Sequence, residues 1–258
     1  MVCRLCGNDA TLKKSHIIPR SYFKSLKSKG GQLISVTCDD VTEPKRTNSD
    51  PKEKLLCEAC ESFLSDNYER YGTRLFKDTK NVNKTKKYIE FNGFKFKEYY
   101  LFLISILWRA SVSSMPEFSA VDLGRKFEEY LESCLKNKSI KLSTALRLEH
   151  IIKISVLRVV DNITGLEDDS IRGALLHFGV QADETKRGPI AYYFMTSGFL
   201  ITYYLSVEPD LHALRTKKIM GQITNRPTLK VPKVEITNLK QVYDAFDSAH
   251  KKAQSYDV

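Results

Sequence analysis

The chain contains 258 residues, 42% of them hydrophobic, which is enough to bury a substantial core and excludes a globally disordered protein. Its formal net charge of +10 at pH 7 favours an anionic partner such as nucleic acid and says nothing about the fold. The first residues lack the charged and apolar stretches of a secretory signal, because Cys3 and Cys6 stand there, so we expect a cytoplasmic protein with reduced cysteines.

Two Cys-x-x-Cys pairs stand within the first 60 residues, Cys3 with Cys6 and Cys57 with Cys60. Two intervening residues make a tight turn on which a pair of thiolates converges, so the two pairs supply four soft ligands for a tetrahedral ion. We therefore predict one structural zinc ion, the alternative being two unrelated pairs of reduced thiols. Cys38 is predicted to be a free thiol.

A basic segment lies between the two pairs. Its charged residues are Lys13, Lys14, Arg20, Lys24, Lys27 and Lys29. Tyr22 and Phe23 stand among them, so the segment is a candidate nucleic-acid-binding surface on which Lys and Arg hold phosphates and the rings rest on sugars or bases. A solvated basic loop is the alternative.

The pattern changes near residue 90, and we predict a zinc-binding module over residues 1–90 and a larger α+β domain over residues 91–258. The run "FKEYYLFLISILWRASVSS" predicts a helix that is buried on most sides, and a second helix places Cys134 in the core. The later apolar runs predict strands in an antiparallel sheet, among them "IIKISVLRVV" and "SIRGALLHFGV", and "NLKQVYDAFDSAHKKAQ" predicts a closing amphipathic helix. The expected fold class is therefore α+β.

One uncharged stretch, residues 190–207, is nearly long enough to span a membrane. Thr196, Ser197 and Gly198 interrupt it, so we predict a β-hairpin and no membrane association. Such a hairpin must be covered, either by the helix from Glu98 to Ser111 or by a second copy of the chain in a homodimer.

The stretches "CRLCG", "SHIIPR" and "LLCEAC" together resemble the HNH endonuclease superfamily over about the first 70 residues. The resemblance implies a treble-clef, ββα-metal module built on a four-cysteine zinc. It also implies His16 as general base, Glu61 as a ligand for a catalytic Mg²⁺ or Mn²⁺, and Arg20 near the phosphate backbone. The implied activity is metal-dependent hydrolysis of phosphodiester bonds, in DNA in preference to RNA, in a defence or mobile-element setting.

Three positions depart from the family pattern. Ser15 replaces the acidic residue before the histidine, Glu61 replaces a histidine, and Lys52 stands where an asparagine is common. The group that orients His16 is thus unidentified, and Glu53, Asp66 and Glu69 are substitutes to test.

Helical spacing predicts that Glu61, Ser65 and Glu69 share one face. Glu61, Asp66 and Glu69 could instead be solvated carboxylates with no role in the site. His16 could instead be a histidine that only packs against the strand or the zinc site. The alternative function is a non-catalytic zinc module that binds nucleic acid or a protein partner. We assign no role to His150, His177, His212 and His250.

Overall fold

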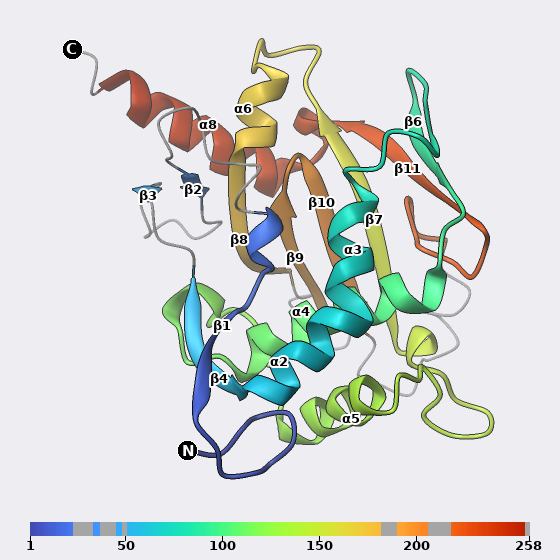
Figure 1. The fold of residues 1–258 in the computed structure, drawn as a ribbon. Coiled ribbons are helices and arrows are strands. Elements are labelled where there is room, and N and C mark those ends of the chain that lie inside the picture. The colour runs from blue at the N-terminus through green and yellow to red at the C-terminus, as the bar shows by residue number, and fades with distance from the viewer. Residues whose placement is uncertain (23–32, 37–44, 48–50, 182–189, 206–217, 256–258) are drawn as a thin grey trace.

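The computed structural model describes residues 1–22, 33–36, 45–47, 51–181, 190–205 and 218–255. Within these residues the chain forms a nine-stranded sheet, a two-stranded sheet and helices on both sides of the large sheet (Figure 1). The predicted α+β class is therefore confirmed. Cys38, Lys24, Lys27 and Lys29, for which the sequence made predictions, lie outside the described residues.

The large sheet has the strand order β3-β2-β8-β9-β10-β7-β11-β6-β5. Its strands are β2 (Leu33–Val36), β3 (Lys45–Thr47), β5 (Val82–Lys84), β6 (Tyr88–Asn92), β7 (Ile152–Val160), β8 (Ala174–Gln181), β9 (Ile190–Thr196), β10 (Phe199–Leu205) and β11 (Thr228–Glu235). Most neighbours are antiparallel, as predicted, but β2 pairs with β8 and β11 with β7 in parallel. The sheet is therefore mixed.

The predicted hairpin is present as β9 and β10. Phe199 pairs with Thr196, so the turn has only two residues between the strands. Both turn residues have positive φ angles, 52° at Ser197 and 74° at Gly198, which is the backbone of the tight turns that match strand twist. The Gly-containing interruption in the sequence is therefore a hairpin turn.

Helices cover the hairpin on both faces. Helix α4 (Phe96–Val112) packs on one face, where the Tyr203 hydroxyl donates to the Leu103 carbonyl at 2.9 Å. On the other face, Leu200 and Met195 pack with Phe246 of α8 (Lys240–Ser255). Of the two alternatives for covering this hairpin, the structure therefore shows cover from within the chain.

The first part of the chain is built on a smaller unit. Strands β1 (Leu12–His16) and β4 (Lys52–Cys57) form an antiparallel pair, and the chain then enters α2 (Glu58–Leu64). A π-helical turn (Ser65–Glu69) connects α2 to α3 (Arg70–Leu75), with α-helical backbone angles at every junction. These pieces form one long helix with a wide turn in its middle.

The remaining helices that the described residues form pack around α4 and the sheet. They are α5 (Arg125–Lys136), α6 (Asp168–Gly173) and three 3₁₀ turns at Pro116–Phe118, Leu148–His150 and Ile236–Asn238. Cys134 is 3% exposed in α5, as predicted. The run "SIRGALLHFGV" was expected to be a strand, but its first part belongs to α6 and the strand begins at Ala174.

A single hydrophobic cluster includes residues from both sides of the predicted boundary near residue 90. Leu56 and Leu64 from the cysteine-bearing part belong to the same cluster as Phe102 and Leu103 of α4. Gly72 of α3 lies directly against the ring of Phe102. The division at residue 90 stays a prediction. Among the described residues, no helix combines the length and hydrophobicity that crossing a membrane requires.

Candidate metal centre and adjoining cavity

The four paired cysteines come together although 51 residues separate Cys6 from Cys57. The sulfur atoms of Cys3, Cys6, Cys57 and Cys60 all lie within 4.8 Å of one another. Cys6 Sγ and Cys57 Sγ are 3.9 Å apart. A tetrahedral zinc with Zn–S bonds of about 2.3 Å would place neighbouring sulfurs about 3.8 Å apart, so this set can bind a zinc ion.

The local backbone explains why the first pair converges. Gly7 has a φ of 76°, and its amide donates to the Cys3 carbonyl at 2.9 Å, which closes a tight turn around the two thiols. The amide of Cys57 donates to Cys3 Sγ at 3.3 Å. Such a bond favours a thiolate, the form that binds metal.

The acidity of the thiols is consistent with a cationic centre. Burial raises the pKa of Cys3, but hydrogen bonds from the backbone of Cys57 and neighbouring residues outweigh it and bring the pKa down to about 7. Burial, together with the neighbouring thiols, raises the pKa of Cys60 well above its usual range, so a thiolate there requires compensating positive charge. A divalent cation between the sulfurs would supply that compensation.

A cavity of about 270 Å³ adjoins the cysteine-bearing unit. It is lined by His16, Pro19, Arg20, Ser21, Glu61, Ser65, Glu69, Arg70, Thr73, Arg74 and Arg109. His16 is the last residue of β1, and Glu61 follows Cys60 in α2. The structure therefore brings His16, Glu61 and Arg20, three residues singled out in the sequence, to one cavity.

The helix that carries Glu61 keeps one face toward this cavity for about two turns. Glu61, Ser65 and Glu69 all line it, which confirms the face predicted from their spacing. Residues four apart drift around an ordinary α-helix of 3.6 residues per turn, but the π turn at Ser65–Glu69 is wider and offsets that drift. The π turn thus keeps Glu69 aligned with Glu61.

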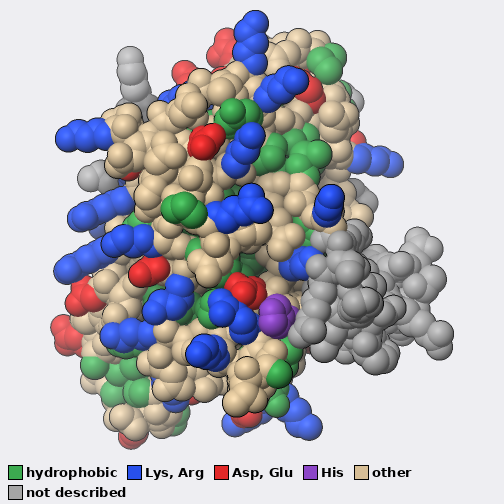
Figure 2. All heavy atoms as spheres, turned by 90° about the vertical axis from the view of Figure 1, so that its right-hand side faces the viewer, with side chains coloured by type: hydrophobic (Ala, Val, Ile, Leu, Met, Phe, Trp, Pro, Cys, Tyr) green, Lys and Arg blue, Asp and Glu red, His purple; other side chains and the backbone are tan. Residues whose placement is uncertain are grey.

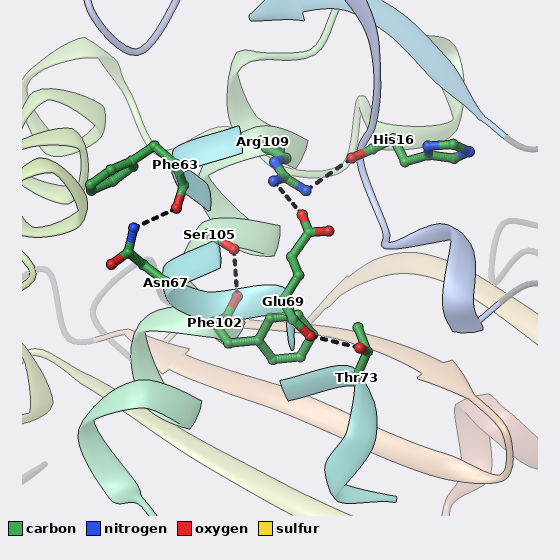
Figure 3. A network of polar contacts seen from close by, with 8 residues as sticks. All are labelled: His16, Phe63, Asn67, Glu69, Thr73, Phe102, Ser105 and Arg109. Atoms are coloured by element: carbon green, nitrogen blue, oxygen red, sulfur yellow. Dashed lines mark hydrogen bonds and ion pairs between the residues drawn. The ribbon is translucent and has the colours of Figure 1, made fainter. Parts of the chain in front are cut away.

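Arg109 is a residue of the site that the sequence reasoning missed. It comes from α4 and is only 1% exposed (Figure 3). Its guanidinium donates to the Glu69 carboxylate at 2.5 Å and to the His16 carbonyl at 3.1 Å. A lone cation within "LISILWRAS" is the signal that was available, since a buried charge requires a partner.

Glu61 and Glu69 differ in how they are used. The Glu69 carboxylate is bound to Arg109, and the Thr73 hydroxyl donates to the Glu69 backbone carbonyl at 2.6 Å (Figure 3). Glu61 Oε1 is buried, and no described residue donates a hydrogen bond to it. Buried carboxylate oxygens ordinarily have donors, so Glu61 is the better candidate for a hard-cation ligand.

Ser15 does not reinforce this ligand set. It is fully buried in β1, and it does not line the cavity although its neighbour His16 does. Successive strand residues point to opposite faces, which is the reason. The two other acidic substitutes are engaged elsewhere, Glu53 with the Ser113 and Ser114 hydroxyls and Asp66 with Arg70.

The basic segment divides into parts with different surroundings. Lys13 and Lys14 are exposed on β1 and do not line the cavity, and Lys13 Nζ lies 3.3 Å from an exposed Glu58 oxygen. Tyr22 was considered as a ring for sugar or base contacts, but this prediction is wrong. Its ring is 1% exposed and packs against Phe76 and Phe102, because the chain turns inward after Pro19.

No protein-family model, curated protein or solved structure matches the chain.

Proposed function

We propose that the chain is a metal-dependent endonuclease of the HNH type that hydrolyses phosphodiester bonds in nucleic acid. The observation that carries the proposal is the meeting of His16 and Glu61 in one cavity, from two elements that the cysteine cluster joins. Cys57 and Cys60 stand at the junction of β4 and α2, and Cys3 and Cys6 precede β1. A zinc ion bound by them would fix the histidine strand against the glutamate helix.

The residues of the cavity suit the chemistry of phosphodiester hydrolysis. His16 supplies an imidazole, the side chain that most often takes a proton from the attacking group in catalysis near pH 7. Arg20, Arg70 and Arg74 bring positive charge for phosphate oxygens. Glu61 would hold Mg²⁺ or Mn²⁺, an ion that stabilises charge on the phosphate and the leaving oxygen.

A second candidate is a non-catalytic zinc module that binds nucleic acid or a protein. One observation favours it, namely that Glu61 is the single cavity carboxylate not bound to a described cation, since Glu69 is paired with Arg109. Mg²⁺ is usually held by one or two carboxylates together with substrate phosphates, so one carboxylate is at the lower limit of what catalysis needs.

Cleavage assays with His16→Ala separate the two candidates. We expect the parent protein to cut DNA only with added Mg²⁺ or Mn²⁺, and His16→Ala to lose about 10²-fold or more of the rate, the range for a general base. Zinc content and thermal stability should not change. Glu61→Ala should chiefly raise the metal concentration needed for half-maximal cleavage.

Glu58→Ala is the matched control for Glu61→Ala, because Glu58 lies in the same helix, is exposed and does not line the cavity. It should cut like the parent. If the parent does not cut single- or double-stranded DNA or RNA with either metal, the non-catalytic module is the better reading.

A further inference from the structure

A strongly basic surface begins at the cavity and continues to the edge of the large sheet. From residue 70 to residue 97 the chain has nine Lys and Arg residues but only two acidic residues, Asp78 and Glu90. All nine basic side chains are exposed, whereas both acidic ones are half-buried. Figure 2, which views the side of the molecule where β6 and β11 lie, shows many Lys and Arg side chains with few Asp and Glu among them.

Hydrogen bonds tie this segment to the cavity. Arg70 and Arg74 line the cavity themselves. Lys77 Nζ donates to the carbonyl of Ser21, another lining residue, at 3.2 Å. The Tyr71 hydroxyl, on the same helix, accepts a hydrogen bond from the Lys95 amide at 2.8 Å. The surface is therefore continuous with the candidate site.

The segment then forms the edge of the sheet as β5 and β6, beside β11. β11 adds the exposed Lys230, which pairs in register with Glu90. We call the whole set the basic strip. It consists of Arg70, Arg74, Lys77, Lys80, Lys84, Lys86, Lys87, Lys95, Lys97 and Lys230.

Protection of the sheet edge explains only part of this strip. Lysine on an edge strand discourages pairing with other chains, and this accounts for Lys84 on β5. It does not account for Lys230, since β11 is an interior strand. Lys95 and Lys97 stand at the start of α4, where positive charge opposes the helix dipole. Among the described residues, only Arg70 of the strip has an ion-pair partner, Asp66.

The two tyrosine rings beside the strip, Tyr71 and Tyr88, are half-buried and each has a lysine over one face, which favours contact with a backbone over stacking of unpaired bases. Lys230 Nζ lies 3.7 Å from the centre of the Tyr88 ring, and Lys95 Nζ lies 6.0 Å from that of Tyr71. Proteins that bind single strands expose rings for base stacking, and RNA readers add stacking or contacts to the 2′-hydroxyl. The strip instead exposes chiefly ammonium and guanidinium groups, which suit phosphates.

We propose that the basic strip binds the phosphate backbone of double-stranded DNA and guides the duplex to the cavity. The guiding role rests on the proposed nuclease function, but the binding does not. Lys87 and Lys95 of the strip stand before and after strand β6, so the length of this strand is a measure of the distance that the strip covers. Strand β6 has five residues and so spans about 14 Å, which corresponds to about four base pairs at roughly 3.4 Å each. Several phosphates can therefore contact the strip at once.

The test is a binding measurement on protein that carries His16→Ala, with no divalent ion added, so that cleavage does not interfere. The strip variant has Lys84→Ala, Lys86→Ala and Lys87→Ala. We expect its affinity for a labelled DNA duplex to fall at least about tenfold, and the slope of log K against log salt, between about 50 and 200 mM, to fall by up to about three units.

A control variant with Lys126→Ala, Lys141→Ala and Lys240→Ala loses the same charge from exposed positions outside the strip. It should keep the parent slope to within about one unit. If both variants lost the same affinity for the duplex, net charge alone would explain the loss and the proposal would be overturned. Unchanged binding by the strip variant would overturn it as well. Tighter binding of single-stranded DNA or of duplex RNA would also overturn it.

The two proposals fail separately. If the strip variant loses DNA binding but the parent never cuts DNA, the strip stands and the nuclease function falls. If the parent cuts DNA, and the three strip substitutions leave binding unchanged in the His16→Ala protein and cutting unchanged in the protein that keeps His16, the nuclease function stands and the strip falls.

Discussion

Arg109 is a cation in the middle of a buried helix, and its contacts join the two sides of the candidate cavity. One guanidinium nitrogen binds the backbone of His16 on β1, and another binds the side chain of Glu69 (Figure 3). Glu69 lies on the long helix that α2, the π turn and α3 form together, which we call the site helix. The His16 imidazole extends away from this contact, so Arg109 holds the strand through the His16 backbone. In the proposed nuclease, Arg109 is therefore a positioning residue.

Replacement of Arg109 by Leu should destabilise the fold, because it leaves the Glu69 carboxylate and the His16 carbonyl without their donor. We expect a loss of about 2 to 4 kcal/mol in the free energy of unfolding, toward the lower side of the range for buried pairs because the Glu69 side chain is 23% exposed. Urea denaturation measures this loss.

The double variant Arg109→Leu/Glu69→Leu removes both charges and should cost less than the sum of the single variants. Strict additivity would show that the two side chains do not interact. Arg109→Lys keeps a charge but not the paired donors, and it should retain more stability than Arg109→Leu.

Among the site residues, those that stand in short sequence motifs could be predicted from the sequence. The spacing of the four cysteines predicts a metal site, and the family resemblance singles out His16 and Glu61. The structure gathers the cysteines in one cluster and brings His16 and Glu61 to one adjoining cavity. Arg109 and Tyr22 could not be placed, because their surroundings come from residues far away in the chain. Tyr22, for example, packs against Phe76 and Phe102.

The contact between α3 and α4 depends on a glycine. A Cβ atom added at Gly72 would lie 2.1 Å from Cδ1 of Phe102, a side chain that is fully buried. The two helices can thus approach closely only because position 72 has no side chain. This approach holds the cavity-lining residues of α3 beside Arg109 of α4.

Gly72→Ala should therefore destabilise the protein although alanine is the better helix former. Propensity alone would add about 1 kcal/mol of stability. Displacement of the Phe102 ring costs more, and we expect a net loss of about 2 kcal/mol in urea unfolding.

Ser62→Ala is a control in the same long helix at an exposed position, and it should be neutral or slightly stabilising. When Phe102→Leu is added to Gly72→Ala, the double variant should lose less stability than the sum of the two single variants, since the obstructing ring is gone. A Gly72→Ala protein more stable than the parent would contradict this account of the packing.

Helices and strands whose apolar residues recur with a clear period could be predicted, whereas the pairing of strands far apart in the chain could not. The hairpin of β9 and β10 and the buried helix α4 follow from local patterns of apolar and turn residues. The parallel pairing of β2 with β8 joins segments about 140 residues apart, and no local signal specifies it.

The cysteine cluster belongs to the main core, so its state should affect the whole molecule. Cys3 and Cys60 belong to the same hydrophobic cluster as Leu64 and as Phe102 of α4. If zinc leaves, the turn around Cys3 loses its attachment to the start of the site helix. The loss should extend to the packing of that helix on α4.

Removal of zinc should therefore lower the melting temperature of the entire chain. A free zinc concentration about a thousandfold above Kd would stabilise the fold by about 4 kcal/mol, which corresponds to roughly 8–16 °C for a chain of this size. Elemental analysis should find one zinc per chain, and Cys57→Ser should lose both the metal and this increment. Cys134→Ala is the control, because Cys134 is a cysteine outside the four-cysteine cluster, so this variant should keep its zinc. Protein that is purified folded with far less than one zinc per chain, and whose melting does not respond to a chelator, would contradict the structural role of the four cysteines.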